Sequence, residues 1–328
     1  MKKLVPAVVA AALLLTACGS GNYAATQLPA APQPAQSSAA PAAPAQCDES
    51  TALQSYAPLN PLPAPGGAMP AGMATIVQRG RLIAGVSADS LHLGARNPLT
   101  GAIEGFDIDM VKAVATAIFG TWKGHLELRV ISSPARIPSL QNNSVDIVAR
   151  NMTINCARWQ KIAFSAEYYH SGQKTLVQRQ PDSTPKYTSL AQMSGKTVCA
   201  PAGSTSLDNL KKKNPAIKTV TADSDTGCLV LFQQGKADGI SGDDTVLAGD
   251  AAQDPYAKVI TERISEEPYG LGINQDNIDF VKFVNGVLAQ MKAPAPGGGP
   301  SAWQVSYGKW LQPDLGPATP PTPQYGRK

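Results

Sequence analysis

Apolar side chains after residue 68 recur at alternating spacings typical of strands and helices. Runs of five or six residues with apolar or alternating side chains predict strands, and apolar side chains three and four positions apart predict helices. The expected elements in chain order are a strand at 81–86, a helix at 108–119, a strand at 126–131, a helix at 137–142 and a strand at 145–149. Asp107 is a suitable N-cap for the first of these helices. This succession predicts an α/β fold with a parallel sheet covered by helices on both faces.

A second unit with the same alternation follows. Its expected strands are 197–200, 218–221 and 236–240, and its expected helices are 207–213, 225–234 and 245–252. A last helix is expected at 278–291, where Phe280, Val281, Phe283, Val284 and Val287 are apolar. The chain therefore has two α/β units and a returning helix.

The N-terminus has the pattern of an export signal. Lys2 and Lys3 precede an apolar run at 4–15, which is too short to span a membrane. We read residues 1–17 as a signal peptide. The segment Leu15-Thr16-Ala17-Cys18 resembles the bacterial lipobox, in which the cysteine carries lipid and anchors the protein outside the cytoplasm at the cell membrane. An ordinary signal peptide, in which Cys18 has no role, is the alternative.

The chain ends differ in composition from the region between them. Residues 18–67 are rich in Pro, Ala, Ser and Gln without any periodicity, so we expect a flexible linker. Residues 319–328 are expected to be a short tail. The net charge is +4 and falls by two when Lys2 and Lys3 leave with the signal, which gives no reason to expect nucleic acid as a partner.

Four of the five cysteines remain once Cys18 is set aside. An even number in an exported protein suggests two disulfides, and four cysteines allow three pairings. We favour the pairs Cys199–Cys228 and Cys47–Cys156. A metal site is the competing interpretation, but there is no C-x-x-C motif and the three histidines are scattered at His92, His125 and His170.

Several short motifs, in a fixed order, carry a resemblance to a known family. They are 105–110, 145–149 with Met152, Thr153 and Arg158, 164–169, 195–198 with 203–205, 238–240 with Asp243 and Asp244, and 269–273. Over residues 79–311 the chain resembles the extracellular solute-binding protein family 3, the polar amino-acid receptors of ABC importers. The order of the motifs is most similar to that of actinobacterial glutamine- and glutamate-binding lipoproteins.

The resemblance implies a two-lobe periplasmic-binding-protein type II fold. The first lobe would comprise 68–170 and 271–318, the second lobe 171–270, and two strands would form the hinge. The implied function is to bind glutamate, glutamine, aspartate or asparagine between the lobes and to deliver it to an ABC importer. No cofactor, metal or catalytic residue is implied, and a monomer is expected.

The resemblance also implies which residues hold the ligand. A free amino acid has a carboxylate and an ammonium group, and both need partners when water leaves. Arg158 and Thr153 would bind the carboxylate, with Asn151 contributing a backbone group. Ser204 and Thr205 lie at a helix start that favours an anion, although simple capping is the alternative there.

The resemblance also implies partners for the ammonium and for the ligand's side chain. Asp244 is expected to hold the ammonium, with Asp243 as the competing choice. Relatives carry an acid where this chain has Ser87, and Asp89 is the nearest acid. Arg136 and Arg150 are candidates for the distal group, and either would favour an acidic ligand.

Two other classes of function remain open. Ser171-x-x-Lys174 and Ser183-x-x-Lys186 fit the S-x-x-K pattern of penicillin-recognising enzymes, but the companion motifs S-D-N and K-T-G are missing. We therefore expect no enzyme. The other alternative keeps amino-acid binding but signals through a membrane sensor protein in place of the importer.

Overall fold

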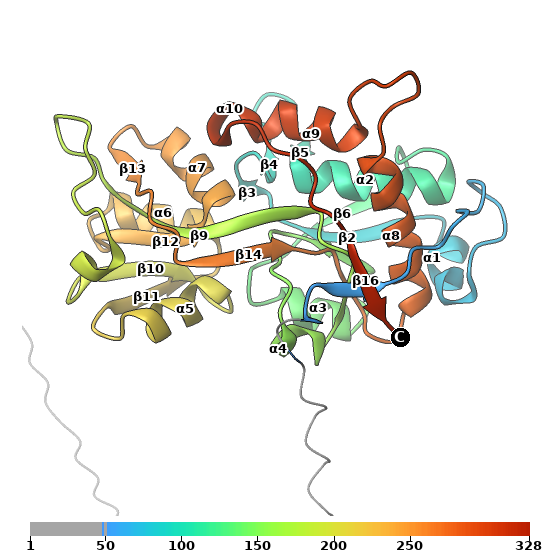
Figure 1. Ribbon diagram of the computed structural model, residues 1–328, viewed down its shortest axis with the longest axis horizontal. Coiled ribbons are helices and arrows are strands. Elements are labelled where there is room, and N and C mark those ends of the chain that lie inside the picture. Colours follow the sequence, from blue (N-terminus) through green and yellow to red (C-terminus); the bar gives the residue numbers. More distant parts are fainter. Residues whose placement is uncertain (1–47, 49–50) are drawn as a thin grey trace, which may run out of the picture. The chain divides into compact units, whose positions relative to one another are not determined.

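The computed structural model describes residue 48 and residues 51–328. The predicted signal peptide, Cys18 and most of the predicted linker lie outside this part of the chain. Two β-sheets, each flanked by helices, account for most of the described residues (Figure 1). No helix in the described part is both long enough and apolar enough to cross a membrane.

The first sheet has five strands in the order β6-β2-β7-β15-β8. They are β6 (Leu126–Val130), β2 (Leu82–Val86), β7 (Ile147–Ala149), β15 (Gly272–Ile273) and β8 (Ala163–Phe164). Strands β6, β2 and β7 are parallel, whereas β15 runs antiparallel to β7 and β8. The helices of this half are α1 (Ala74–Arg79), α2 (Phe106–Phe119), α3 (Arg136–Gln141), α4 (Cys156–Trp159), α8 (Ile278–Lys292), α9 (Ala302–Trp310) and α10 (Gln312–Leu315). We call this half the first lobe.

A small antiparallel sheet belongs to the same half. It consists of β3 (Asp89–Ser90), β4 (Gly94–Arg96) and β5 (Ile103–Glu104). The largest apolar core packs α2, α8 and α9 against the first sheet, and Trp303 and Phe106 are fully buried in it.

The second sheet has six strands. The order is β11-β10-β12-β9-β13, and β14 also pairs with β9. They are β11 (Lys218–Ala222), β10 (Thr197–Pro201), β12 (Gly239–Asp243), β9 (Tyr169–Gln178), β13 (Ala257–Val259) and β14 (Ser265–Tyr269), with helices α5 (Thr205–Lys213), α6 (Asp225–Gln233) and α7 (Asp244–Gln253). Two separate apolar cores lie on this sheet. We call this half the second lobe.

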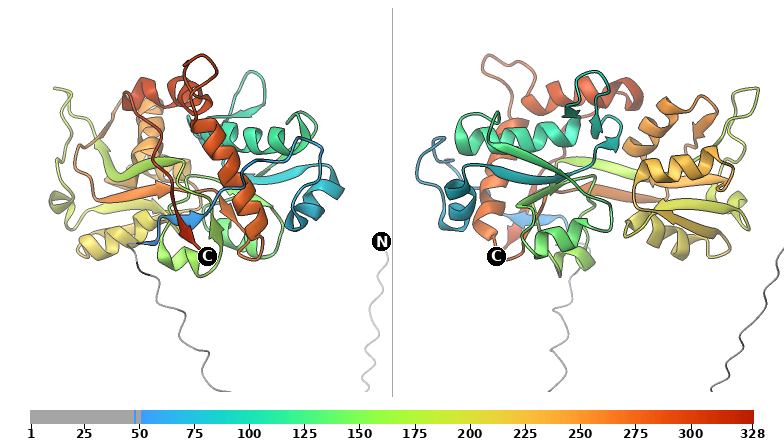
Figure 2. Two further views of the ribbon diagram at one scale, coloured as in Figure 1. Left: turned by 45° about the vertical axis from the view of Figure 1, so that its right-hand side comes forward. Right: turned by 180° about the vertical axis from the view of Figure 1, so that it is seen from behind.

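Strands β9 and β14 connect the two lobes. They pair antiparallel from Tyr169 opposite Tyr269 to Gln173 opposite Ser265. Both long strands run between the two halves of the molecule (Figures 1 and 2). The predicted two-lobe α/β fold is confirmed, with mixed sheets where a mostly parallel sheet was expected in each lobe.

The described parts of the two chain ends are more ordered than predicted. Strand β1 (Gln54–Tyr56), at the end of the predicted flexible linker, pairs in parallel with β16 (Gln324–Arg327), in the predicted tail. The indole of Trp159 donates to the carbonyl of Ala52 (2.7 Å) and stacks against the guanidinium of Arg327 at 3.7 Å. Such short strands paired across the whole chain length leave no periodic pattern in the sequence.

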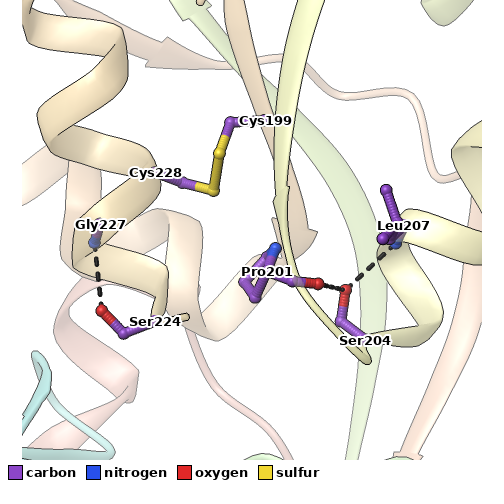
Figure 3. Close-up of a disulfide and its surroundings, with 7 residues drawn as sticks. All are labelled: Cys199, Pro201, Ser204, Leu207, Ser224, Gly227 and Cys228. Carbon is purple, nitrogen blue, oxygen red and sulfur yellow. Dashed lines mark hydrogen bonds between the residues drawn. A yellow bond between two sulfur atoms is a disulfide. The ribbon is translucent and has the colours of Figure 1, made fainter. Parts of the chain in front are cut away.

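A disulfide joins Cys199 in β10 to Cys228 in α6 (Figure 3). Their Cα atoms are 5.5 Å apart and 29 positions separate them in the sequence. The bond fixes α6 against the second sheet. The other expected pair, Cys47–Cys156, includes a cysteine outside the described residues.

Candidate functional site

Polar side chains from both lobes line one buried cavity between the two sheets. The lining residues are Ser133, Arg136, Asn151, Thr153, Pro201, Ser204, Thr205, Ser206, Asp225, Gly242 and Asp243. They lie at or after the carboxyl ends of strands β6, β7, β10, β11 and β12, where α/β sheets bind ligands. The free space is only about 10 Å³, so the lobes must part, or side chains must move, to admit a ligand. We call this space the interlobe cavity.

Five of the predicted site residues line the interlobe cavity: Arg136, Asn151, Thr153, Ser204 and Thr205. The hydroxyl of Ser204 is used for capping, since it accepts from the backbone N–H of Leu207 (3.1 Å) and donates to the carbonyl of Pro201 (2.6 Å) (Figure 3). The capping alternative is therefore correct for this side chain. The start of α5 still faces the cavity through Thr205.

The two threonines converge on a carboxylate that the sequence analysis did not consider. Thr153 (2.6 Å) and Thr205 (2.7 Å) both donate their hydroxyls to Oε2 of Glu267, which is 1% exposed. Glu267 lies in hinge strand β14, whose neighbouring Glu266 is exposed. The only sequence signal is this alternation, because side chains of a strand point to opposite faces.

Arg158 is buried at the edge of the cavity. Its Nη1 donates to the carbonyl of Thr153 (2.7 Å), and its Nη2 donates across to the carbonyl of Gly203 (3.4 Å). It also borders a groove of about 540 Å³ that Arg136 and Thr205 line as well. Burial lowers the pKa of Arg158. Its guanidinium therefore lies in a dry region where a carboxylate partner is worth more than in water.

Arg136 is held by backbone carbonyls. It donates to Ser133, Arg150 and Asn151 within its own lobe, at 3.0, 3.1 and 3.1 Å, and to Gly203 across the cavity at 3.3 Å. Burial, together with the neighbouring Arg158 and Arg150, lowers its pKa to about 9. Arg136 thus adds positive charge to the cavity, while its hydrogen bonds shape the loop after β7.

The predicted placement of Asp244 in the cavity is wrong. Its carboxylate accepts from the hydroxyl of Ser171 (2.6 Å), lies 3.6 Å from Arg263, and lines a different cavity beside Lys174. The adjacent Asp243 lines the interlobe cavity instead. Strand β12 continues through Asp243 and α7 starts at Asp244, so the two carboxylates point apart.

Asp243 has an oxygen available for a ligand. It occupies the N-cap position of α7 but makes no capping bond. Its Oδ2 accepts from the hydroxyl of Tyr269 (2.7 Å), and its buried Oδ1 has no partner. Burial, and next the charge of Glu267, raise the pKa of Asp243 well above its ordinary value. A cationic group near Oδ1 would stabilise the ionised form.

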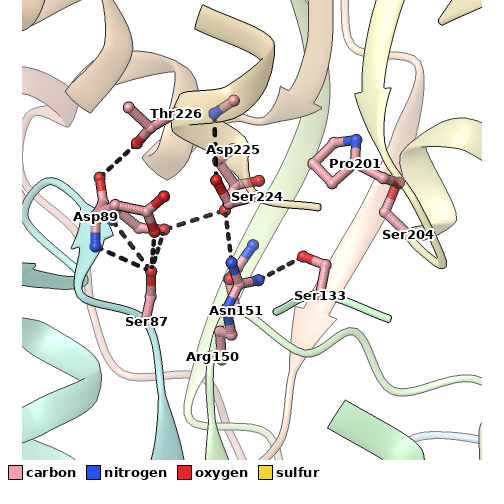
Figure 4. A network of polar contacts seen from close by, with 12 residues as sticks. Ser87, Asp89, Ser133, Arg150, Asn151, Pro201, Ser204, Ser224, Asp225 and Thr226 are labelled. Carbon is pink, nitrogen blue, oxygen red and sulfur yellow. Dashed lines mark hydrogen bonds and ion pairs between the residues drawn. The ribbon is translucent and has the colours of Figure 1, made fainter. Parts of the chain in front are cut away.

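Asp89 belongs to a network of polar contacts beside Asp225 (Figure 4) and is not among the residues that line the interlobe cavity. It accepts from the hydroxyl of Ser87 (2.6 Å), and its carbonyl accepts from Thr226 of the second lobe (2.8 Å). Next to it, Ser90 donates to Asp225 (3.0 Å), which is one of the cavity residues. Asp89 therefore joins the two lobes but does not line the cavity.

Arg150, left open by the sequence, belongs to the same network. It is 1% exposed, bonds to Ser133, and lies 3.8 Å from Asp225 (Figure 4). Its Nε is buried without a partner. Arg150 and Asp225 thus form a pair of opposite charges, of which Asp225 lines the interlobe cavity.

Asp107 supports the loop that carries Asn151. Helix α2 begins at Phe106, so Asp107 is not its N-cap as expected. Its carboxylate accepts from the backbone N–H of Asn151 (2.9 Å) and from the hydroxyl of Tyr168 (2.7 Å), and burial raises its pKa to about 6. The Gly-Phe-Asp motif therefore positions the site.

The chemistry of the cavity is that of paired opposite charges. Among the described residues, no group of three or more His, Cys, Asp and Glu side chains could hold a metal ion. The buried arginines together with Asp243 suit a small molecule that carries both an anionic and a cationic group. A cavity of this kind between two hinged α/β lobes defines a two-lobe solute receptor.

Comparison with known proteins gives the family. The chain belongs to the bacterial extracellular solute-binding proteins, family 3, whose model matches residues 82–295. This is a family of binding proteins, not of enzymes.

The chain is also similar to individual proteins that are named for the amino acid they bind. A protein of Geobacillus stearothermophilus named a glutamine-binding protein is 36% identical over 208 residues, which cover 63% of this chain and 78% of the relative. The ABC transporter glutamine-binding protein GlnH of Bacillus subtilis is 29% identical over 243 residues, covering 74% and 85%. Among solved structures, a P235GK mutant of ArgBP from T. maritima matches with a TM-score of 0.65 and 29% identity, covering 74% of this chain and 99% of that one.

Proposed function

We propose that this protein binds a free polar amino acid in the interlobe cavity and delivers it to an ABC importer. The candidate ligands are glutamate, glutamine, aspartate and asparagine. One observation supports the proposal above others: the unpartnered Oδ1 of Asp243 and the guanidinium groups of Arg136 and Arg158 meet in one buried region. The names of the glutamine-binding relatives point to the same class of ligand.

The proposed pose has the two charged groups of the ligand at opposite partners. Arg158 and the backbone N–H groups at the start of α5 bind the α-carboxylate. Asp243 accepts from the α-ammonium. The side chain then extends toward Arg150 and Asp225, whose opposite charges suit a polar end group. Pairing at both charged ends supports a dissociation constant in the micromolar range, about −8 kcal/mol.

Membrane attachment is part of the proposal. The signal-like N-terminus and Cys18 support a lipid anchor outside the cytoplasm, close to a membrane partner. A Cys18→Ser variant is expected to be released from the membrane fraction of expressing cells. A variant that stays in that fraction as the wild type does would contradict the anchor, without bearing on ligand binding.

Titration calorimetry of the protein with the four amino acids tests the proposal. At least one is expected to bind, and Arg158→Ala is expected to abolish that binding while the thermal transition remains cooperative. Arg129→Ala is the matched control, because this exposed arginine pairs with Glu127 on the surface. Heat from none of the four would refute the function, and unchanged affinity in Arg158→Ala would refute the pose.

A further inference from the structure

Glu267 connects both lobes and the hinge through a single side chain. Its Oε2 accepts from Thr153 of the first lobe (2.6 Å) and from Thr205 of the second (2.7 Å). Its Oε1 accepts from the hydroxyl of Ser265 (2.6 Å) and the amide of Asn209 (3.2 Å). Glu267 itself belongs to β14, the strand by which the chain returns through the hinge. These bonds from both lobes exist together only when the lobes approach each other.

The carboxylate of Glu267 determines which way the two threonine hydroxyls point. An ionised carboxylate only accepts hydrogen bonds, and a hydroxyl has one hydrogen to donate. Because Thr153 and Thr205 each give that hydrogen to Glu267, the part of each hydroxyl oxygen that faces the cavity has only lone pairs. Their oxygens lie 3.2 Å apart. Such a pair of acceptors suits an ammonium group and repels a carboxylate.

We propose that Glu267 is a positioning residue that turns the hydroxyls of Thr153 and Thr205 into acceptors for the ligand's α-ammonium, next to Asp243. The inference rests on the proposed function and deepens it. It changes the role of Thr153, whose hydroxyl was expected at the ligand's carboxylate. The carboxylate is then bound by Arg158 and by backbone N–H groups alone.

The arrangement also couples ligand binding to the approach of the two lobes. A bound ammonium would contact Asp243 of β12 together with two hydroxyls that are fixed by Glu267 of β14. Ligand recognition and the approach of the lobes therefore share one carboxylate. Arg158 lies close enough for the charge of Glu267 to raise its pKa, against the larger lowering by burial.

The test compares two neighbouring glutamates of one strand. Glu267→Gln keeps the shape but adds an amide donor, which forces at least one hydroxyl to turn. Glu266→Gln is the matched control, because its side chain is exposed and pairs with His170 and Arg263. Titration uses whichever of L-glutamate, L-glutamine, L-aspartate and L-asparagine binds the wild type best. We expect Glu267→Gln to weaken the affinity for this amino acid about 10- to 100-fold, which is the contribution of a hydrogen bond to a charged group. The control is expected to change that affinity less than about 3-fold.

A second ligand identifies the end of the molecule that is affected. The counterpart of the same amino acid without its α-amino group, such as glutarate for L-glutamate, is measured by competition. Its affinity relative to the parent amino acid is expected to rise at least about 10-fold in Glu267→Gln. An equal loss for both compounds would overturn the assignment to the ammonium.

A third variant shows whether Glu267 acts through the threonine. Thr205→Val removes the hydroxyl without changing the shape, and it is expected to weaken the amino acid without adding its full effect to that of Glu267→Gln. Fully additive losses, or an unchanged affinity in Glu267→Gln, would overturn the inference. If the wild type binds none of the four amino acids, the proposed function itself fails; if it binds and the glutamine variant binds equally well, only this inference fails.

Discussion

Replacing one carboxylate oxygen by an amide nitrogen should weaken binding strongly at Asp243 and hardly at all at Asp244. The two carboxylates are adjacent in the sequence, but only Asp243 lines the interlobe cavity. Asp244 is bonded to Ser171 and lies near Arg263 in another cavity. Asp243→Asn and Asp244→Asn are therefore a matched pair, with the same chemical change one position apart.

The expected magnitudes follow from burial. Asp243 is 5% exposed, so an ammonium at its Oδ1 forms a charge-assisted bond in a dry site. Such bonds contribute about 1.5–3 kcal/mol, and leaving a buried charge without its partner costs about 3–5 kcal/mol. We expect Asp243→Asn to weaken the amino acid by about 3 kcal/mol, or roughly 100-fold. Arg263, the charged partner of Asp244, has a side chain that is 40% exposed, so losing that pair changes affinity less than about 3-fold.

Titration calorimetry of both variants with the best-binding amino acid tests which of the two aspartates binds the ammonium group. Thermal unfolding of each variant without ligand shows that both are folded. A large loss in Asp244→Asn with near-normal binding in Asp243→Asn would refute the assignment of the ammonium site. It would restore the position that the sequence alone suggested.

Two further predictions concern protons and the chain ends. Burial, and then Glu267, raise the pKa of Asp243, whereas a bound ammonium favours its ionised form. Binding of the amino acid should therefore release protons, and its affinity should fall as the pH falls through the raised pKa of Asp243. Calorimetry in two buffers of different ionisation enthalpy measures the number of protons released. Proton uptake on binding would contradict the prediction. Deleting residues 319–328 removes β16 and should lower the melting temperature by about 3–6 °C, which corresponds to a loss of about 1–2 kcal/mol of stability in a chain of this size. An unchanged melting temperature would show that the β1–β16 pairing does not stabilise the protein.

The fold could be predicted wherever apolar periodicity marks an element. The bounds of the strands were hardest to predict where their residues line the interlobe cavity. The expected strand 236–240 is observed as Gly239–Asp243, because Ser241 and Asp243 are buried polar residues and Gly242 lies between them. Polar residues that face the cavity interrupt the apolar pattern of a strand. A strand expected to end at residue 240 also leaves open which of Asp243 and Asp244 faces the cavity.

The site was predictable where its residues are close in sequence. Thr153 and Arg158 lie within one loop, and the carbonyl of the first accepts from the second. Glu267 is different, since its two threonine donors are 114 and 62 positions away in the sequence. Its role depends on the hinge strand lying between the loops of both lobes. Such a contact is fixed by the tertiary fold and has no local signal.

The contacts across the cavity also indicate why a ligand should favour the closed arrangement. The lobes already meet through direct bonds, such as those from Arg136 and Arg158 to the carbonyl of Gly203. Each bond of this kind adds little net stability, because the open lobes would bond to water instead. In the arrangement observed here, Oδ1 of Asp243 and Nε of Arg150 are buried without partners, which costs about 1–3 kcal/mol for each group. A ligand that bonds to these atoms removes that penalty only in the closed form. Because the ligand binds the closed arrangement more tightly than the open one, it shifts the population toward the closed arrangement. A membrane partner that binds only the closed arrangement would then respond to the ligand.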